Sequence, residues 1–192
     1  MLTATPQLPE ATRLTESQQL VLPGYCSWEQ FEALDLILEG ISGLKITYLD
    51  GCVEFMTIGE DHEEIKSIIA LLLGLYFLEL GIDFIPVGSA TRRSREQNVS
   101  FEPDESYYLG EKKAHPDLAI EVTFSSGDPS KLEKYRRLGI AEVWFWQKGK
   151  ISVYGLRGAD YEPIAKSELL PDLDFALLER CVLMPAKRRC DG

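Results

Sequence analysis

The chain has 192 residues, 45% of them hydrophobic and 27% charged, which are ordinary values for one domain with a sizeable core. Its formal net charge of −11 and its pI of about 4.7 disfavour a generic nucleic-acid binder, because such proteins present a basic face to phosphate. No apolar run reaches the roughly 20 residues of a membrane span, and no secretory signal is recognisable. The four cysteines are scattered without a C-x-x-C pair, which predicts reduced thiols in a cytoplasmic protein rather than a zinc site.

The domain organisation follows from the hydrophobic pattern along the chain. Residues 1–20 are polar and contain proline, which predicts a mobile N-terminal tail. Residues 21–185 carry regular hydrophobic patterns without a repeat or linker, and they predict a single domain. Residues 186–192 predict a polar C-terminal tail.

The first predicted elements are a short strand in QQLVLPGYC, a helix and a β-hairpin. Ser27 and Gln30 have the spacing of a capping box, which predicts a helix through WEQFEALDLILEG that ends at Gly40. Two β-rich runs then flank Asp50-Gly51, a dipeptide suited to the tight type I′ turn of a hairpin.

A long helix and several strands are predicted next. GEDHEEIKSIIALLLGLYFLELGI has a wide apolar stripe, with Asp61 and Glu64 as a capping pair and Gly81 as its end. Strand patterns follow in DFIPVGSATRR, VSFEPDESYYL and PDLAIEVTF, then a short helix that starts at Pro129 or Ser130. EVWFWQ and KISVYGL predict another hairpin, before a last strand and helix. Because strands and helices alternate in the middle, we expect an α/β domain with a mixed sheet.

The strand PDLAIEVTF carries a carboxylate within an otherwise apolar run. Because successive side chains alternate between faces, Asp117, Ala119, Glu121 and Thr123 share one face, and the other face is uniformly apolar. Ionised carboxylates are seldom buried without a partner or a metal. Glu121 is therefore either a solvated or lysine-paired strand residue, or a functional carboxylate.

Asp104, in the preceding strand pattern, is the expected partner of Glu121. Asp117 lies about 13 Å from Glu121 along its own strand, too far for one cation to bridge, whereas adjacent strands are only ~4.8 Å apart. If the register allows, the carboxylates of Asp104 and Glu121 approach within ~4–5 Å and form a hard-oxygen site suited to Mg²⁺. The alternative is that Asp104 is an ordinary strand-end residue.

Basic and imidazole side chains are expected near this pair. The helix after the Glu121 strand carries Lys131 and Lys134, and an ammonium there could hold a phosphate, unless this helix face is simply solvated. His62, followed by Glu63, sits in the first turn of the long helix. A histidine at this position is either a base or ligand, or an ordinary surface residue.

Taken in order, these segments resemble the PD-(D/E)XK nuclease core. More closely, the chain is similar to a bacterial family of "putative restriction-endonuclease-like" proteins. The matching segments are YLDGCVEFM, EDHEEI, EPDESYYL, HPDLAIEV and GIAEVWFW, with Lys131 and Tyr135 before the last of them. The resemblance covers roughly residues 25–180. It implies a restriction-endonuclease-like core, a central mixed sheet flanked by helices, with an N-terminal helix and β-hairpin.

The resemblance also implies roles for the matching positions. Asp104 and Glu121 would hold Mg²⁺, or Mn²⁺ in its place, while Lys131 stabilises the charge that develops as a DNA phosphodiester is hydrolysed. His62 and Glu63 match the helix that often supplies a further acidic or water-positioning group.

One position departs from the nuclease pattern. That pattern has a lysine two residues after the glutamate, and this chain has Thr123 there. The resemblance implies that in this family the lysine lies on the next helix instead, where Lys131 matches the family pattern and Lys134 does not. Glu54 matches an acidic position on the hairpin strand without an evident purpose.

Two functions stay open at this point. One is a Mg²⁺-dependent DNA endonuclease, favoured by Asp104, Glu121 and Lys131. The other is a nuclease-fold domain that has lost hydrolysis and acts as a binding or oligomeric interaction module, favoured by the acidic pI and Thr123. Edge strands such as KISVYGL could pair two copies, so a homodimer is a further expectation.

Overall fold

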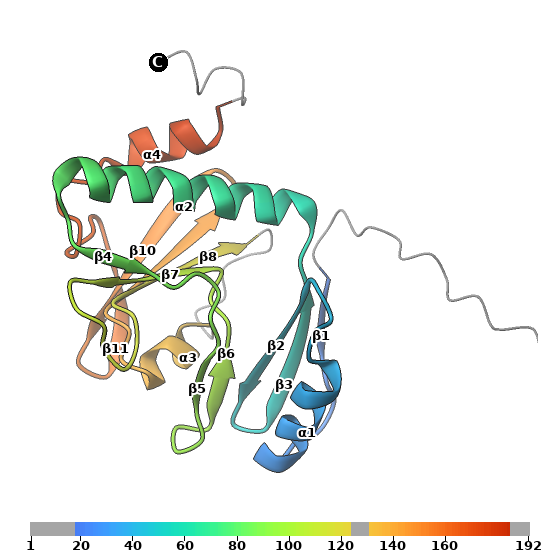
Figure 1. Cartoon of the computed structure of the whole chain (residues 1–192). Helices are drawn as coiled ribbons and strands as arrows, with labels where there is room; N and C mark the ends of the chain where they lie inside the picture. Colours follow the sequence, from blue (N-terminus) through green and yellow to red (C-terminus); the bar gives the residue numbers. More distant parts are fainter. Residues whose placement is uncertain (1–17, 124–130, 185–192) are drawn as a thin grey trace, which may run out of the picture.

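The structure is a computed structural model that describes residues 18–123 and 131–184. These residues form two β-sheets and four helices, and one of the sheets is mixed (Figure 1). The predicted α/β class is therefore confirmed. Most of the predicted N-terminal tail and the whole predicted C-terminal tail lie outside the described residues, as do Pro129 and Ser130. The first strand begins at Gln19, inside the segment that the sequence assigns to the tail.

The larger sheet has six strands in the order β11-β10-β9-β8-β7-β4. Its strands are β4 (Phe84–Pro86), β7 (Glu105–Leu109), β8 (Leu118–Thr123), β9 (Glu142–Gln147), β10 (Lys150–Arg157) and β11 (Asp160–Ile164). The β8–β9 pair is parallel and the other pairs are antiparallel. Parallel neighbours need a crossover connection, and the short helix α3 (Leu132–Arg137) lies in it.

The smaller sheet is antiparallel and has five strands in the order β1-β3-β2-β6-β5. Its strands are β1 (Gln19–Val21), β2 (Leu44–Leu49), β3 (Cys52–Thr57), β5 (Arg92–Ser94) and β6 (Val99–Phe101). The sequence predicts a strand in VSFEPDESYYL with Pro103 at a strand start or edge, and the structure has two strands there. The segment divides at Pro103-Asp104, so that β6 joins the smaller sheet and β7 the larger one. Proline lacks the N–H that a continuous ladder requires, and Asp104 consequently lies at the junction of the two sheets.

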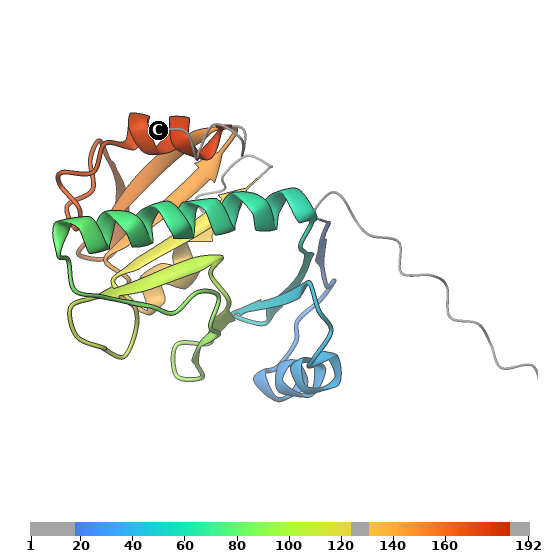
Figure 2. The same ribbon diagram turned by 45° about the horizontal axis from the view of Figure 1, so that its top comes forward.

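Helices cover both faces of the larger sheet (Figures 1 and 2). The long helix α2 (Glu60–Leu80) crosses one face with α4 (Phe175–Val182) beside it, and α3 lies on the opposite face. Alternate residues of β8 enter the two cores: Leu118, Ile120 and Val122 pack in the cluster that contains α2 residues, and Ala119 packs with α3. Both faces of β8 are therefore buried.

The remaining helix, α1 (Trp28–Leu38), covers one face of the smaller sheet, where Phe31 packs with Tyr48 and Val53. Its predicted capping box is confirmed, since the backbone N–H of Gln30 donates to the Ser27 hydroxyl and the Gln30 side chain accepts from Ser27. This cap and the packing of Phe31 fix α1 on the outer side of the hairpin and leave the hairpin's other face to the rest of the molecule.

The predicted turn is also confirmed, but one predicted cap is wrong. Asp50 and Gly51 have φ values of 49° and 87°, as a type I′ turn requires. The α2 helix has Gly59 as its N-cap without a side-chain hydrogen bond, because Asp61 and Glu64 lie inside the helix. Gly81 ends α2 in the left-handed conformation, as predicted. Within the described part of the chain, no helix has the length and hydropathy needed to cross a bilayer.

Candidate active site

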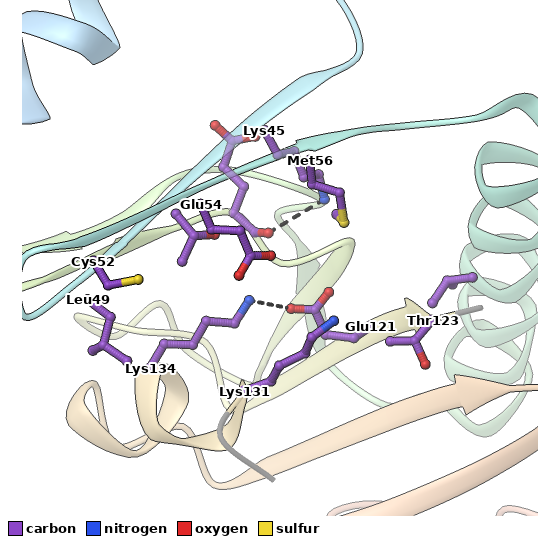
Figure 3. A pocket seen from close by; sticks show the side chains of 12 residues that line it. Lys45, Leu49, Cys52, Glu54, Met56, Glu121, Thr123, Lys131 and Lys134 are labelled. Atoms are coloured by element: carbon purple, nitrogen blue, oxygen red, sulfur yellow. Dashed lines mark hydrogen bonds and ion pairs between the residues drawn. The ribbon is translucent and has the colours of Figure 1, made fainter. Parts of the chain in front are cut away.

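A pocket of about 190 Å³ opens at the carboxyl end of β8, between the two sheets (Figure 3). One wall is a face of the β2–β3 hairpin, and the other is the end of β8 together with α3. A pocket of this size has room for several water molecules or for a phosphate group.

The hairpin wall follows from strand alternation and from the register that the Asp50-Gly51 turn sets. The directly opposed pairs Lys45–Met56, Thr47–Glu54 and Leu49–Cys52 all face the pocket. The intervening residues, Ile46, Tyr48, Val53 and Phe55, pack in the cluster beneath α1. The hairpin is thus amphipathic, and its more polar face is the one that points into the pocket.

Asp104 lies behind this pocket and is fully buried. Its Oδ1 accepts a hydrogen bond from Lys45 Nζ at 2.5 Å. Its Oδ2 accepts the backbone N–H of Val122 at 2.7 Å and lies 2.9 Å from Nε2 of His62. A single carboxylate therefore ties together β2, β8 and the first turn of α2.

Asp104 lies close to the segment of β8 that carries Glu121. It directly precedes β7, whose first residue, Glu105, is paired with Ile120 of β8. The Asp104 carboxylate also accepts the backbone N–H of Val122, the residue after Glu121. The two carboxylates also act on a common cation, because both raise the pKa of Lys45.

The charges of this cluster sustain one another. Burial alone would raise the pKa of the Asp104 carboxyl, but the hydrogen bond with His62 and the charge of Lys45 outweigh burial and hold that pKa below its usual range. Burial alone would likewise lower the pKa of Lys45, and the carboxylates of Asp104 and Glu121 reverse this and raise it. Asp104 and Lys45 are therefore both ionised at neutral pH.

Glu121 is only 5% exposed and has two partners on α3. Its Oε1 accepts from Lys134 Nζ at 2.8 Å and from the hydroxyl of Tyr135. Burial, followed by the charge of Glu121, raises the pKa of Tyr135, so this side chain remains a neutral donor. The Lys134 ammonium also lies 5.0 Å from the ring centroids of Phe101 and Tyr135.

The structure decides between alternatives that the sequence leaves open. Glu121 is not solvated; it is buried and paired with a lysine, which is one of the predicted alternatives. The lysine that contacts it is Lys134, and both Lys134 and Lys131 line the pocket (Figure 3). His62 is buried, not a surface residue, and its ring meets Asp104. Glu63 does not line the pocket; its carboxylate is half-exposed and pairs with Lys66 at 2.7 Å.

Sequence reasoning missed Lys45. A signal was present, since the predicted turn at Asp50-Gly51 fixes the hairpin register and so places Lys45 on the same face as Glu54. One face of the hairpin thus carries a lysine and a glutamate, and its other face is apolar. This pattern indicates that the polar face lines a pocket or a solvated surface. Only the position of the second sheet shows that it is a pocket.

The donor set of this cluster fits a divalent cation in part. Among residues 18–123 and 131–184, no group of three or more His, Cys, Asp or Glu side chains is arranged to hold a metal. Mg²⁺, however, commonly uses one or two carboxylates and completes its shell with waters and phosphate. Asp104 and Glu121 are the two carboxylates that would serve, and in this structure Lys45 and Lys134 contact them.

The comparison with family models gives one match that spans most of the chain. The model described as "Uma2: Putative restriction endonuclease" matches residues 28–183. The chain belongs to the Uma2 family. A comparison with curated proteins finds no match. The Uma2 match includes all four helices and every residue of the cluster around Asp104 and Glu121, and it confirms the restriction-endonuclease-like fold.

The contacts of this Uma2 site predict different effects for its two helix lysines. Lys134→Met is expected to lower the free energy of unfolding by about 1–3 kcal/mol, because buried Glu121 loses its charged partner and keeps the Tyr135 hydroxyl. Lys131→Met is expected to change it by no more than ~0.5 kcal/mol, since Lys131 lines the pocket and forms no ion pair with residues 18–123 or 131–184. Urea denaturation followed by circular dichroism measures both, and equal losses would contradict the pairing of Glu121 with Lys134.

Proposed function

We propose that the chain is a metal-dependent endonuclease that hydrolyses DNA phosphodiester bonds in the pocket beside Glu121. The observation that carries this proposal is that buried Asp104, just before β7, and Glu121 of the neighbouring strand β8 both act on Lys45, beside a pocket that Glu121, Lys131 and Lys134 line. Paired carboxylates and lysines are the groups that metal-assisted phosphoryl transfer requires. The membership in the Uma2 family supports the same class of reaction.

The proposed cation is Mg²⁺, with Mn²⁺ as a substitute, and Asp104 and Glu121 would hold it through their carboxylate oxygens. When bound, such a cation polarises the phosphate and lowers the pKa of a coordinated water. Lys131, at the pocket wall, would stabilise the negative charge that develops on the phosphoryl oxygens.

Two further residues would act by orienting the carboxylates. His62 is almost fully buried and its Nε2 lies 2.9 Å from Asp104 Oδ2, so it fixes that carboxylate rather than touching substrate. The Tyr135 hydroxyl holds Glu121 in the same way. Both are positioning residues in this account.

The negative net charge of the chain affects how it would bind DNA. A net charge of −11 opposes the approach of a polyanion, and the binding energy would have to come from the pocket and its cation. Cleavage is consequently expected to need the metal both for affinity and for chemistry. Raising the salt concentration would then weaken DNA binding less than it does for proteins with a basic face.

The test is a cleavage assay with the full chain. We expect nicking of supercoiled plasmid, or cleavage of single-stranded DNA, with Mg²⁺ or Mn²⁺ and none with EDTA. The absence of cleavage of both substrates with either metal would contradict the proposal. Cleavage that continues in EDTA would show that the reaction does not depend on a metal.

A second candidate function is a binding or oligomeric interaction module without hydrolysis. Its support is that a lysine already pairs with each carboxylate, at 2.5 Å for Asp104 and 2.8 Å for Glu121. The α2 helix also carries exposed leucines at helical spacing, Leu71, Leu75 and Leu78. This candidate predicts no calorimetric Mg²⁺ binding and a homodimer in light scattering.

A further inference from the structure

We propose that Lys45 occupies the position of the cation between Asp104 and Glu121, so that a divalent metal binds only after the Lys45 ammonium has left Asp104. Lys45 would then be a competitor built into the site, not a ligand or a catalytic residue. This inference rests on the proposed function only for the assignment of the two carboxylates to the metal.

The surroundings of the Lys45 ammonium are those of a bound cation. Its Nζ lies 2.5 Å from Asp104 Oδ1, 3.2 Å from the carbonyl oxygen of Pro103 and 3.5 Å from that of Glu102. An ammonium has three N–H donors, and three oxygens are within reach of it. The carboxylate of Glu121 is also within electrostatic reach of this group. Lys45 is therefore surrounded by oxygen atoms in the way that a hard cation would be.

Lys45 and a divalent metal exclude one another at this position. A metal ligated by Asp104 would stand ~2 Å from a carboxylate oxygen, and the ammonium is bonded to one of those oxygens at 2.5 Å. The lysine side chain is 6% exposed, so solvent would screen the repulsion between the two cations only weakly. The metal can enter only if the ammonium moves.

The pocket offers the displaced ammonium another partner. Glu54 lies on the neighbouring strand, two positions along the register from Met56, the residue opposite Lys45, and both side chains face the pocket (Figure 3). Diagonal neighbours of this kind are ~7–8 Å apart, within the reach of a lysine side chain with its four flexible carbons. When a metal is bound to Asp104, Glu54 would therefore accept the hydrogen bond of the displaced Lys45 ammonium.

The test measures Mn²⁺ binding by calorimetry in the full chain and in three variants. If the metal-ready state of the wild type is populated at about 10% or less, Lys45→Met should lower the apparent Kd for Mn²⁺ about tenfold or more. Lys66→Met, which removes an ion pair on α2 outside the pocket, serves as the control with unchanged Kd. A Kd for Mn²⁺ in Lys45→Met that is equal to or higher than that of the wild type would overturn the inference.

A second variant covers the case in which Lys45→Met does not fold without metal. Lys45→Arg keeps the positive charge and can bind Asp104 with two donors, so its Kd for Mn²⁺ is expected to be higher than that of the wild type. A Kd equal to or lower than the wild-type value would overturn the inference. The same preparations would show a Mn²⁺-induced rise of the melting temperature that is largest for Lys45→Met.

The cleavage assay separates this inference from the proposed function. Cleavage by the wild type together with an unchanged Kd in Lys45→Met removes the inference alone. Tighter Mn²⁺ binding by Lys45→Met without cleavage by the wild type leaves the inference and removes the endonuclease. The absence of Mn²⁺ binding in all variants contradicts both.

Discussion

Asp104→Asn is expected to lower the free energy of unfolding by roughly 3–5 kcal/mol, because it leaves the buried Lys45 ammonium without its counter-charge. Asparagine has nearly the shape of aspartate and keeps a carbonyl oxygen for the backbone N–H of Val122. The loss would therefore report the missing charge and not a cavity. Urea denaturation at pH 7, followed by circular dichroism, gives the measurement.

Asp117→Asn is the matched control for this variant. Asp117 accepts hydrogen bonds from the backbone N–H of Leu109 and from the exposed Lys113, and its loss should be about 1 kcal/mol. A loss below ~1 kcal/mol in Asp104→Asn would show that the ion pair with Lys45 does not stabilise the fold.

The pH dependence of the same variant has a definite sign. The pKa of Asp104 is lowered in the folded protein, so its stabilising effect is present above the unfolded value of about 3.9 and is lost as the pH falls toward the lower folded value. The difference in stability between the wild type and Asp104→Asn should consequently narrow from about pH 5 to pH 2. A difference that stays constant over this range would contradict the lowered pKa.

Glu121→Gln is expected to reduce the rate of DNA cleavage at least about 100-fold, because it removes the negative charge that would hold the metal. The glutamine retains a carbonyl oxygen that Lys134 and Tyr135 can bond, which favours a folded variant. Single-turnover nicking of supercoiled plasmid with Mg²⁺ measures the rate, and circular dichroism verifies the fold.

Asp117→Asn again serves as the control, because Asp117 is a carboxylate four residues before Glu121 whose partners are Leu109 and Lys113. Its cleavage rate should stay within about threefold of the wild type, since its contacts lie away from the pocket. A large loss in Asp117→Asn with little loss in Glu121→Gln would contradict the assignment of Glu121 to the metal.

The sequence predicted best those features that depend on neighbouring residues. The capping box at Ser27, the type I′ turn at Asp50-Gly51 and the strand that carries Glu121 are all set by side chains within a few positions of one another. The short helix after that strand was also predictable. Lys131 and Lys134 have different surroundings because α3 begins at Leu132, so that Lys131 is its N-cap and Lys134 lies within the helix.

The features that could not be predicted depend on contacts between distant parts of the chain. Lys45 meets Asp104 across 59 residues, and His62 meets it across 42. No pattern of neighbouring residues predicts that the side chains of Lys45 and His62 are buried. The division of VSFEPDESYYL between two sheets is of the same kind, because only the pairing of β6 with β2 and of β7 with β8 separates the two halves.

The central claim is that Asp104 and Glu121 together hold a divalent cation. The most direct measurement is an anomalous difference map from crystals of the full chain soaked in Mn²⁺. The account predicts a peak within ~2.0–2.6 Å of an oxygen of each carboxylate, with the Lys45 ammonium turned away from Asp104. A map without this peak, in which Lys45 still bonds Asp104 at saturating Mn²⁺, would contradict it.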